Sequence, residues 1–364
     1  MRGVAVLGST GSIGRSALAV LGRQREHFRV VALTGGTNAA LLDAQVAEWA
    51  PSFSGLAGPG ESGVLLEAAT HPSVDIVINA VVGAAGLDAT LAALRAGKRV
   101  ALANKESLVM AGDLVRAAAR EGGGELVPVD SEHSAVLQCI TGRGSPLTRL
   151  ILTASGGPFR EWPAERVAGA TVTQALRHPT WQMGHKITVD SATLANKALE
   201  VIEAHQLYGL AYDDIDVVVH PQSIVHAFVE FADGSVLAQL GFPTMELPIL
   251  YALTHPTRLP DAGVPRFDPV AAGPLTFEPV RADVFRAFAT GVAAGRAGGT
   301  APAVFNAANE AAVAAFLEGR IPFGRIADTI DAVLGAHVVE PATALEAVRG
   351  ADRWARERAR EEMS

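Results

Sequence analysis

The pattern of apolar and polar positions changes twice along the chain. Over the first 130 residues, short apolar runs alternate with longer segments in which apolar residues recur at helical spacing. The short runs predict strands at residues 3–7, 29–33, 75–79, 98–102 and 125–129. The longer segments predict helices at residues 13–21, 39–49, 87–95 and 108–120. Because strands alternate with helices, the pattern favours a doubly wound parallel sheet as the first domain, residues 1–130.

The second change separates a mixed region from a helical one. Apolar runs predict strands at residues 150–153, 216–220, 224–231 and 235–240, the last two forming a hairpin through Ala232, Asp233 and Gly234. We therefore expect a central α+β catalytic domain over residues 131–258. Five prolines with little periodicity predict an extended linker at residues 259–283. Helical spacing at residues 284–293, 301–317, 324–334 and 342–360 predicts a C-terminal helical bundle, residues 284–364.

Composition excludes several classes of protein. Of the 364 residues, 49% are hydrophobic and 19% charged, which excludes a disordered chain. The net charge is -8 and the basic residues are scattered, so nucleic acid is not an expected partner. Stretches without Asp, Glu, Lys or Arg reach only 13 residues, short of the ~18–20 that a membrane-spanning helix needs. The N-terminus lacks the pattern of a secretory signal, and the single cysteine, Cys139, is typical of an apolar filler in a reducing compartment. We expect a soluble, cytoplasmic protein.

A glycine-rich turn follows the first predicted strand and opens the first predicted helix. The run Gly8-Ser9-Thr10-Gly11-Ser12-Ile13-Gly14 would let backbone N–H groups approach a phosphate at the helix N-terminus. Its spacing differs from the usual dinucleotide fingerprint, and a tight structural turn is the alternative. The second predicted strand is followed by Thr34-Gly35-Gly36-Thr37-Asn38, without the acid that holds the ribose of NAD. This favours a Rossmann-like domain that binds NADP.

Two acidic residues close the last predicted strand of the first domain. In an extended segment, Asp130 and Glu132 would point the same way, beyond the carboxyl end of the strand. Carboxylate oxygens suit Mg²⁺ or Mn²⁺. The alternative is that Asp130 or Ser131 caps the helix that follows.

A second polar group lies in a predicted helix that begins at Asp190 or Ser191 and includes residues up to 200. Asn196, Lys197 and Glu200 would share one edge of this helix. A surface salt bridge is the ordinary interpretation of such a pair, but the apolar neighbours favour a buried polar site as strongly.

Two loops add reactive side chains. The segment Thr153-Ala154-Ser155-Gly156-Gly157 offers a hydroxyl and backbone N–H groups, which suit an anion. Residues 178–186 form a loop bounded by glycine and proline, a candidate lid. Ordinary packing is the alternative for its Trp181 and Met183.

Taken together and in this order, these segments resemble the 1-deoxy-D-xylulose 5-phosphate reductoisomerase family over essentially the whole chain. The resemblance also covers Asn104-Lys105-Glu106-Ser107, His220-Pro221-Gln222-Ser223, Gly299-Thr300-Ala301-Pro302-Ala303 and Asn306-Ala307-Ala308-Asn309-Glu310. It implies the conversion of 1-deoxy-D-xylulose 5-phosphate to 2-C-methyl-D-erythritol 4-phosphate in non-mevalonate isoprenoid biosynthesis, with NADPH and a divalent cation. It also implies a homodimer.

The resemblance assigns roles to particular residues. It implies an NADPH site at Thr10, Gly11, Ser12, Ile13, Gly36, Asn38, Asn104, Glu106 and Gly184. It implies metal ligands at Asp130, Glu132 and Glu200, which together with Lys105 would carry the catalysis. The implied substrate contacts are Lys105, Ser131, Glu132, Ser155, His178, Ser191, Asn196, Lys197 and Glu200, with Trp181 and Met183 on the lid.

The chain departs from the family pattern in three places. Thr37 stands where a lysine is usual near the 2′-phosphate, and His185 stands where the lid usually has arginine. Residues 51–63 form a shorter segment than usual, which should affect only a peripheral connection. The competing interpretations are another NADP-linked reductase of a sugar phosphate or semialdehyde, which has no use for three metal carboxylates, and a non-catalytic NADP-sensing regulator.

Overall fold

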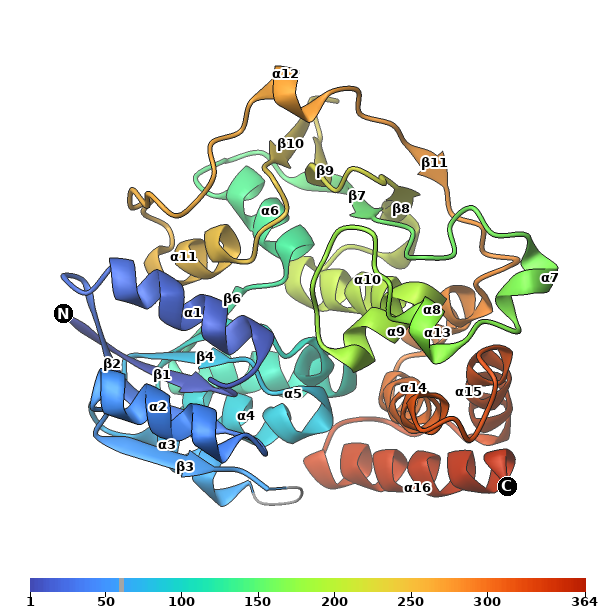
Figure 1. The fold of residues 1–364 in the computed structure, drawn as a ribbon, viewed down its shortest axis with the longest axis horizontal. Coiled ribbons are helices and arrows are strands. Elements are labelled where there is room, and N and C mark those ends of the chain that lie inside the picture. Colours follow the sequence, from blue (N-terminus) through green and yellow to red (C-terminus); the bar gives the residue numbers. More distant parts are fainter. Residues whose placement is uncertain (59–61) are drawn as a thin grey trace. The chain divides into compact units, whose positions relative to one another are not determined.

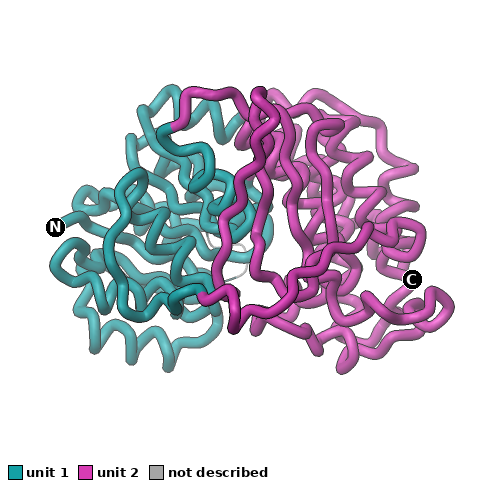
Figure 2. The backbone as a smooth tube through the Cα atoms, turned by 90° about the horizontal axis from the view of Figure 1, so that it is seen from above, with its two compact units in different colours: residues 1–107, 114–142, 244–267 teal, residues 108–113, 143–243, 268–364 magenta. Residues whose placement is uncertain are grey.

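The chain forms two compact units, each with its own sheet and its own hydrophobic core (Figure 2). The computed structural model describes residues 1–58 and 62–364, so the predicted short segment 51–63 lies partly outside the described residues. The two units draw on the following parts of the chain: residues 1–107, 114–142 and 244–267 for unit 1, and residues 108–113, 143–243 and 268–364 for unit 2. Each unit thus has the anatomy of a domain.

Unit 1 is built on a six-stranded parallel sheet (Figure 1). Its strands are β1 (Arg2–Leu7), β2 (Phe28–Gly35), β3 (Phe53–Leu56), β4 (Ile76–Asn79), β5 (Arg99–Leu102) and β6 (Glu125–Pro128). They lie in the order β3-β2-β1-β4-β5-β6, and neighbouring strands pair in parallel. This is the order of a Rossmann sheet, which binds ligands beyond the carboxyl ends of its strands where the order reverses. The predicted Rossmann-like fold is confirmed.

Unit 1 also contains helices, most of which connect these strands. They are α1 (Ser12–Arg23), α2 (Ala39–Trp49), α3 (Gly63–Thr70), η1 (Gly83–Gly86), α4 (Leu87–Arg95), α5 (Lys105–Gly122), α6 (Ser131–Ile140) and α11 (Glu246–Thr254), although residues 108–113 of α5 belong to unit 2. The predicted strands and helices are present with small shifts at their ends. The prediction missed β3, α3 and α11. Strand β3 is a four-residue edge strand, and α11 is buried continuously over residues 248–253, so neither shows a clear periodic pattern.

The division of the chain differs from the predicted domain boundaries. Residues 131–142 and 244–267, expected in the central domain and the linker, belong to unit 1. In that unit, α11 packs against both α1 and α6. The Arg23 guanidinium also pairs with Glu246 at 2.5 Å and with Asp261 at 2.6 Å. The chain returns to the first sheet after leaving it, which a local pattern does not reveal. The assignment of separate functions to the predicted domains stays a prediction.

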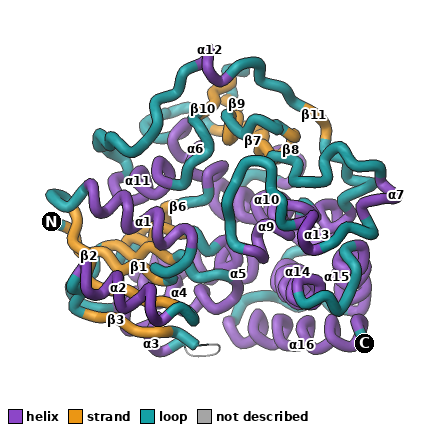
Figure 3. The backbone as a smooth tube through the Cα atoms, viewed as in Figure 1, coloured by secondary structure: helices purple, strands orange, loops and turns teal. Residues whose placement is uncertain are grey.

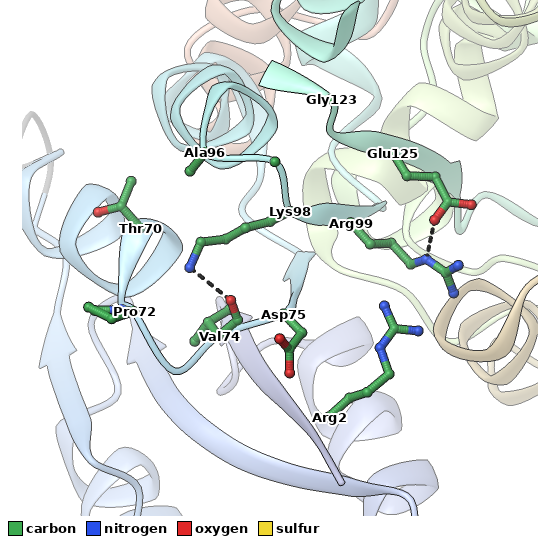
Figure 4. A pocket seen from close by; sticks show the side chains of 11 residues that line it. Arg2, Thr70, Pro72, Val74, Asp75, Ala96, Lys98, Arg99, Gly123 and Glu125 are labelled. Carbon is green, nitrogen blue, oxygen red and sulfur yellow. Dashed lines mark hydrogen bonds and ion pairs between the residues drawn. The ribbon is translucent and has the colours of Figure 1, made fainter. Parts of the chain in front are cut away.

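The amino ends of four strands of unit 1 surround a polar cavity of about 620 Å³ (Figure 4). Its lining includes Arg2, Asp75, Lys98, Arg99 and Glu125. The Lys98 ammonium donates to backbone carbonyls of the turn that precedes β4, and burial lowers its pKa. Arg99 pairs with Glu125 at 2.6 Å and donates to carbonyls near the end of α11. Arg99 therefore holds the C-terminal end of α11 at the amino edge of the sheet, where a cation is favourable.

Unit 2 contains a mixed sheet of five strands. They are β7 (Leu147–Ala154), β8 (Ile215–Val219), β9 (Val225–Phe231), β10 (Val236–Leu240) and β11 (Glu278–Pro279), in the order β10-β9-β7-β8-β11. Strand β7 runs parallel to β8 and antiparallel to β9. Strands β9 and β10 form the predicted hairpin, whose turn is completed by Gly234 at φ +80°. The predicted α+β character of this part is confirmed.

Helices make up most of the rest of unit 2 (Figure 3). They are α7 (Ala164–Val167), α8 (Val172–Ala175), α9 (His185–Thr193), α10 (Ala195–Tyr208), η2 (Tyr212–Asp214), α12 (Pro269–Ala272), α13 (Arg286–Ala297), α14 (Ala301–Leu317), α15 (Gly324–Ala336) and α16 (Leu345–Met363). Helix α14 is buried over most of its length and packs against α13, α15 and α16. The predicted helical bundle is confirmed. Within the described residues, no helix combines the length and the apolar composition that crossing a membrane requires.

The predicted linker at residues 259–283 is not a free spacer. Its first part belongs to unit 1, where the Gln24 amide donates to the Pro260 carbonyl at 2.9 Å. Its second part contains α12 and β11, and β11 pairs with β8 at the edge of the second sheet. Pro279 is tolerated there because an edge strand needs fewer backbone donors. The prolines therefore mark a chain that is extended but packed.

Candidate active site

The carboxyl edge of the first sheet carries a buried ion pair. Lys105 is the first residue of α5 and follows β5, whereas Asp130 follows β6. Because β5 and β6 are parallel neighbours, their carboxyl ends meet at one edge, and the Lys105 ammonium pairs with the Asp130 carboxylate. Burial alone would raise the pKa of Asp130, but Lys105 and His133 hold it well below its usual range. Asp130 is therefore ionised at neutral pH.

A second carboxylate lies beside Asp130. Glu132 is in the first turn of α6, where the Ser131 hydroxyl donates to it. The reason predicted for their proximity was wrong, because β6 ends at Pro128 and Glu132 is helical. Their ligand oxygens nevertheless lie within 4.8 Å. Asp130 occupies the N-cap position of α6, but its side chain pairs with Lys105. Two adjacent carboxylates repel each other unless a cation lies between them, so this pair has the chemistry of half a cation site.

The glycine turn has the geometry that a phosphate site needs. Gly8 has φ +79°, and a Cβ on Gly14 would lie 2.3 Å from the Gly8 carbonyl oxygen, so larger residues do not fit at either position. Gly11 is exposed at the N-terminus of α1, next to the partly exposed Thr10, Ser12 and Ile13. Free backbone N–H groups at such a helix end attract an anion.

Two other predicted cofactor residues also have structural contacts. The Asn104 amide donates to the Val81 and Gly83 carbonyls at 2.8 Å and also to Glu106, which fixes the loop after β4. Asn38 caps α2, its Oδ1 accepting from the Leu41 N–H at 3.1 Å. Gly36 and Gly184 are exposed. These contacts position the loops at the carboxyl edge of the sheet. The cofactor-binding roles of these residues stay predictions.

The polar helix of unit 2 differs from the prediction. Instead of one helix that begins at Asp190 or Ser191, the structure has α9 and α10, separated by Leu194 at φ +59°. Asp190 and Ser191 lie inside α9. A left-handed leucine is costly, so tertiary packing decides this break. The break starts a new helix that carries Asn196, Lys197 and Glu200.

These three residues form a buried cluster. The Lys197 ammonium donates to the Glu200 carboxylate and to the backbone carbonyl of Thr153 at the end of β7. The Asn196 amide donates to the other oxygen of Glu200. The Lys197 and Glu200 side chains are only 5% and 2% exposed, so the surface salt bridge is the wrong alternative and the buried polar site is confirmed.

Three further predicted residues meet around an imidazole. His178 Nε2 lies 3.0 Å from the Ser155 hydroxyl and 3.1 Å from the Ser191 hydroxyl. His178 Nδ1 accepts from the backbone N–H groups of Thr180 and Trp181, at 3.1 and 2.8 Å. An acceptor at Nδ1 places the proton on Nε2. Burial lowers the pKa of His178 to about 4, so at neutral pH this group is an uncharged donor between two hydroxyls.

The predicted lid residues lie in the segment without regular structure between α8 and α9. Trp181 and Met183 are both partly exposed, and the Trp181 ring is tilted at 6.5 Å from the ring of His226. Neither belongs to the buried core of unit 2. The geometry is compatible with a lid, and that role stays a prediction.

The sequence analysis missed one buried polar contact. Asn309 in α14 donates to Asp190 in α9 at 2.8 Å, and both side chains are buried. The available signal was the pair Asn306 and Asn309, polar residues one turn apart in a helix otherwise rich in alanine.

A Rossmann sheet with a glycine turn, together with buried lysines that face carboxylates, defines a dinucleotide-dependent oxidoreductase with a polar catalytic site. Comparison with known proteins is consistent with this class. Three models of 1-deoxy-D-xylulose 5-phosphate reductoisomerases match the chain: the enzyme model at residues 4–60 and 56–112, and two C-terminal-domain models at residues 126–208 and 240–358.

Curated relatives and solved structures agree with the family models. The 1-deoxy-D-xylulose 5-phosphate reductoisomerase of Heliobacterium modesticaldum is 49% identical, covering 99% of this chain and 97% of the relative. That of a Synechococcus strain is 50% identical, covering 98% and 96%. A DOX-P reductoisomerase in complex with NADPH, fosmidomycin and magnesium has a TM-score of 0.92 and 38% identity, covering 100% of this chain and 98% of that one. The Zymomonas mobilis enzyme in complex with NADPH has a TM-score of 0.91 and 40% identity, covering 100% and 99%. The chain belongs to the 1-deoxy-D-xylulose 5-phosphate reductoisomerase family.

Proposed function

We propose that this protein converts 1-deoxy-D-xylulose 5-phosphate to 2-C-methyl-D-erythritol 4-phosphate, using NADPH and a divalent cation. Full-length identity near one half to reductoisomerases is the observation that carries the proposal. In the reaction, the ketose carbon chain rearranges to a branched aldehyde of the same composition. The aldehyde carbon then gains a hydride and its oxygen gains a proton. Bound NADPH supplies that hydride.

The donor set fits a divalent cation. Asp130 and Glu132 provide adjacent carboxylates in unit 1, and Glu200 provides a buried carboxylate in unit 2. Hard oxygen donors of this kind suit Mg²⁺ or Mn²⁺, and structures of relatives contain magnesium. We assign Asp130, Glu132 and Glu200 as the ligands. A bound cation would polarise the ketone and acidify the neighbouring hydroxyl of the substrate.

Side chains around these carboxylates would hold and orient the substrate. Lys105, with its charge held by Asp130, would donate to an oxygen at the reacting end, next to Ser131. At the other end, the Ser155 and Ser191 hydroxyls and the His178 Nε2–H form a cluster of neutral donors for the phosphate. Lys197 and Asn196, which are on α10, would complete the set of residues that bind the phosphate. Binding energy from the phosphate would orient the reacting carbons.

The nucleotide would lie along the carboxyl edge of the first sheet. Thr10, Gly11, Ser12 and Ile13 would meet its diphosphate at the N-terminus of α1. Gly36 and Asn38 lie beyond β2, where the absence of an acid leaves room for a 2′-phosphate. Asn104, Glu106 and Gly184 would complete the site, and Trp181 and Met183 would close over the substrate.

Two further expectations accompany the function. We expect a homodimer, as the family resemblance implies, and a location in the cytoplasm. Light scattering coupled to gel filtration measures the molar mass in solution, and a mass that corresponds to one chain would contradict the dimer. Fractionation of the native cells measures the location.

A coupled assay tests the function. Purified protein with the ketose phosphate, NADPH and Mg²⁺ should oxidise NADPH, and NMR of the product should show the branched methyl tetrol phosphate. A chelator should stop the reaction, and added Mg²⁺ or Mn²⁺ should restore it. Oxidation of NADPH that continues in the chelator would favour an ordinary sugar-phosphate or semialdehyde reductase. NADPH binding without any turnover would favour a sensing protein.

A further inference from the structure

Asp190 is a buried carboxylate that the proposed reaction does not use. Its side chain is 1% exposed. The Asn309 amide of α14 donates to its Oδ1 at 2.8 Å, and the Lys186 ammonium lies 3.0 Å from its Oδ2. Burying a carboxylate is costly unless it is paired and hydrogen-bonded. The hydrogen bond and the ion pair of Asp190 therefore offset the cost of burying its charge, which indicates that these contacts have a structural or functional role.

The local energetics of α9 do not explain this pair. Lys186 is the second residue of the helix and Asp190 is the fourth from its end. The helix dipole disfavours a cation in the first turn and an anion in the last. A lysine that precedes its acidic partner by four residues is also the weaker of the two orientations. The stabilising contact is therefore the tertiary one, between Asp190 and Asn309.

That contact determines where Ser191 points. Consecutive helical residues project about 100° apart around the axis, so holding Asp190 against α14 sets the direction of the Ser191 side chain. The Ser191 hydroxyl lies 3.1 Å from His178 Nε2. The backbone there is tightly packed, because a Cβ on Gly157 would lie 2.6 Å from the Ser191 carbonyl oxygen. A small rotation of α9 would therefore disturb both the hydroxyl and the Ser155 loop.

Lys186 extends the same contact to the loop that carries Trp181 and Met183. This loop ends at Gly184, the N-cap of α9, two residues before Lys186. We propose that Asp190 is a positioning residue: through Asn309 it sets the rotation of α9, and thereby aims the Ser191 hydroxyl at His178 in the phosphate pocket. The inference rests on the proposed function only for the identity of the ligand in that pocket.

An exchange of side chains tests the proposal by kinetics. Asp190→Asn removes the charge with little change in shape, and Asn309→Asp places two carboxylates face to face. The double variant Asp190→Asn with Asn309→Asp restores an amide–carboxylate hydrogen bond in the opposite sense. Asn at position 190 still accepts from Asn309 but carries no charge, so we expect Asp190→Asn to raise the KM for the ketose phosphate up to about tenfold, the difference between a charged and a neutral hydrogen bond. The KM for NADPH should change much less, Asn309→Asp should be worse, and the double variant should recover most of the loss.

A matched control separates this effect from general loss of charge. Asp328 on α15 pairs with Arg286 at the surface, so Asp328→Asn removes a paired carboxylate from the same unit. It should leave both KM values unchanged. A parallel rise in the KM for ketose phosphate and for NADPH, in step with a lower melting temperature, would reduce Asp190 to a structural role and overturn the proposal.

A second measurement needs no turnover. Imidazole ¹⁵N NMR, with the His178 signal identified from its loss in His178→Gln, reports the Nε2 hydrogen bond directly. The signal should shift in Asp190→Asn, return in the double variant and stay in place in Asp328→Asn. An unchanged signal in Asp190→Asn overturns the proposal, whereas a wild type without activity would instead refute the proposed function. If Asp190→Asn does not fold, Asn309→Ala removes only the amide donor and should shift the same signal.

Discussion

Each unit contains a buried lysine–carboxylate pair, and the two pairs arise in different ways. Lys105 and Asp130 come from the ends of two neighbouring parallel strands and meet because the sheet brings them together. Lys197 and Glu200 are three residues apart on one helix and meet because of helical spacing. The first pair depends on the topology of the sheet and the second on spacing within one helix. Similar chemistry therefore places different demands on the fold.

The difference extends to the neighbours of each pair. Asp130 lies beside a second carboxylate, Glu132, so two carboxylates gather near the Lys105 ammonium that pairs with Asp130. Lys197 also donates to a backbone carbonyl, and Glu200 also accepts from Asn196. Both charged groups of that pair therefore have a hydrogen-bond partner besides each other. Removing one partner of a buried pair costs about 3–5 kcal/mol because the other charge remains. Each substitution below therefore needs a folding control.

The largest effect should come from the carboxylates of both units. Asp130→Asn, Glu132→Gln and Glu200→Gln should each reduce kcat/KM by about a thousandfold or more, because loss of an anionic ligand costs several kcal/mol of transition-state stabilisation. Steady-state kinetics at several Mg²⁺ concentrations measures this, with circular dichroism as the folding control. Glu346→Gln changes a glutamate that is 83% exposed and should have no effect. A variant that keeps more than about a tenth of wild-type kcat/KM would contradict the assignment of that ligand.

The next effect distinguishes the two lysines. Lys197→Ala removes the single full cation proposed for the phosphate, and a charge-assisted hydrogen bond contributes roughly 1.5–3 kcal/mol. We expect kcat and kcat/KM to fall together, and the Kd of a metal-chelating phosphonate analogue to rise about tenfold or more. Lys105→Ala should reduce kcat severely with a smaller change in that Kd. An equal Kd for wild type and Lys197→Ala, measured by calorimetry, would return Lys197 to the role of a partner for Glu200.

A smaller effect concerns pH and the His178 cluster of unit 2. The folded pKa of His178, about 4, lies below the unfolded value near ~6.5. The unfolded chain therefore binds the extra proton first, and stability is complete above pH ~6.5 and falls as pH decreases towards ~4. His178→Gln cannot titrate and should lack this part of the pH dependence, which we expect to be about 2 kcal/mol because solvent screens the partly exposed ring. Urea unfolding of both proteins between pH 7 and 4 measures it, and parallel curves would contradict the role of burial.

The smallest effect lies in the nucleotide site of unit 1. With no acid after β2, NADPH should be preferred to NADH. Thr37 is exposed, and Thr37→Lys should lower the KM for NADPH only a few-fold, since an exposed charge pair contributes about 0.2–1 kcal/mol. The KM for NADH should not change. Thr148→Lys adds the same charge at another exposed position and serves as the control. Equal kcat/KM values for NADPH and NADH in the wild type would show that the absence of an acid after β2 does not select NADPH.

Local pattern was sufficient for most of the fold. Strands β1, β2, β4, β5 and β6 and helices α2, α4 and α14 appear where apolar periodicity predicts them, because each buries one face or a continuous core. The pattern failed at the short edge strand β3 and at α11, whose central residues form one apolar run. It also failed at Leu194, whose left-handed conformation splits the predicted polar helix. In each case, packing against distant segments outweighs local preference.

The order of residues along the chain already specifies the available chemistry: the glycine turn, the missing acid after the second strand, and the spacing of Asn196, Lys197 and Glu200. Which of these groups are buried, and which partners they have, depends on the folded arrangement of the chain. That arrangement placed Lys105 against Asp130, returned α11 to the first sheet, and brought Asn309 to Asp190 from a distant helix. Periodicity is a local property, whereas burial and the pairing of charges depend on segments that are far apart in the chain.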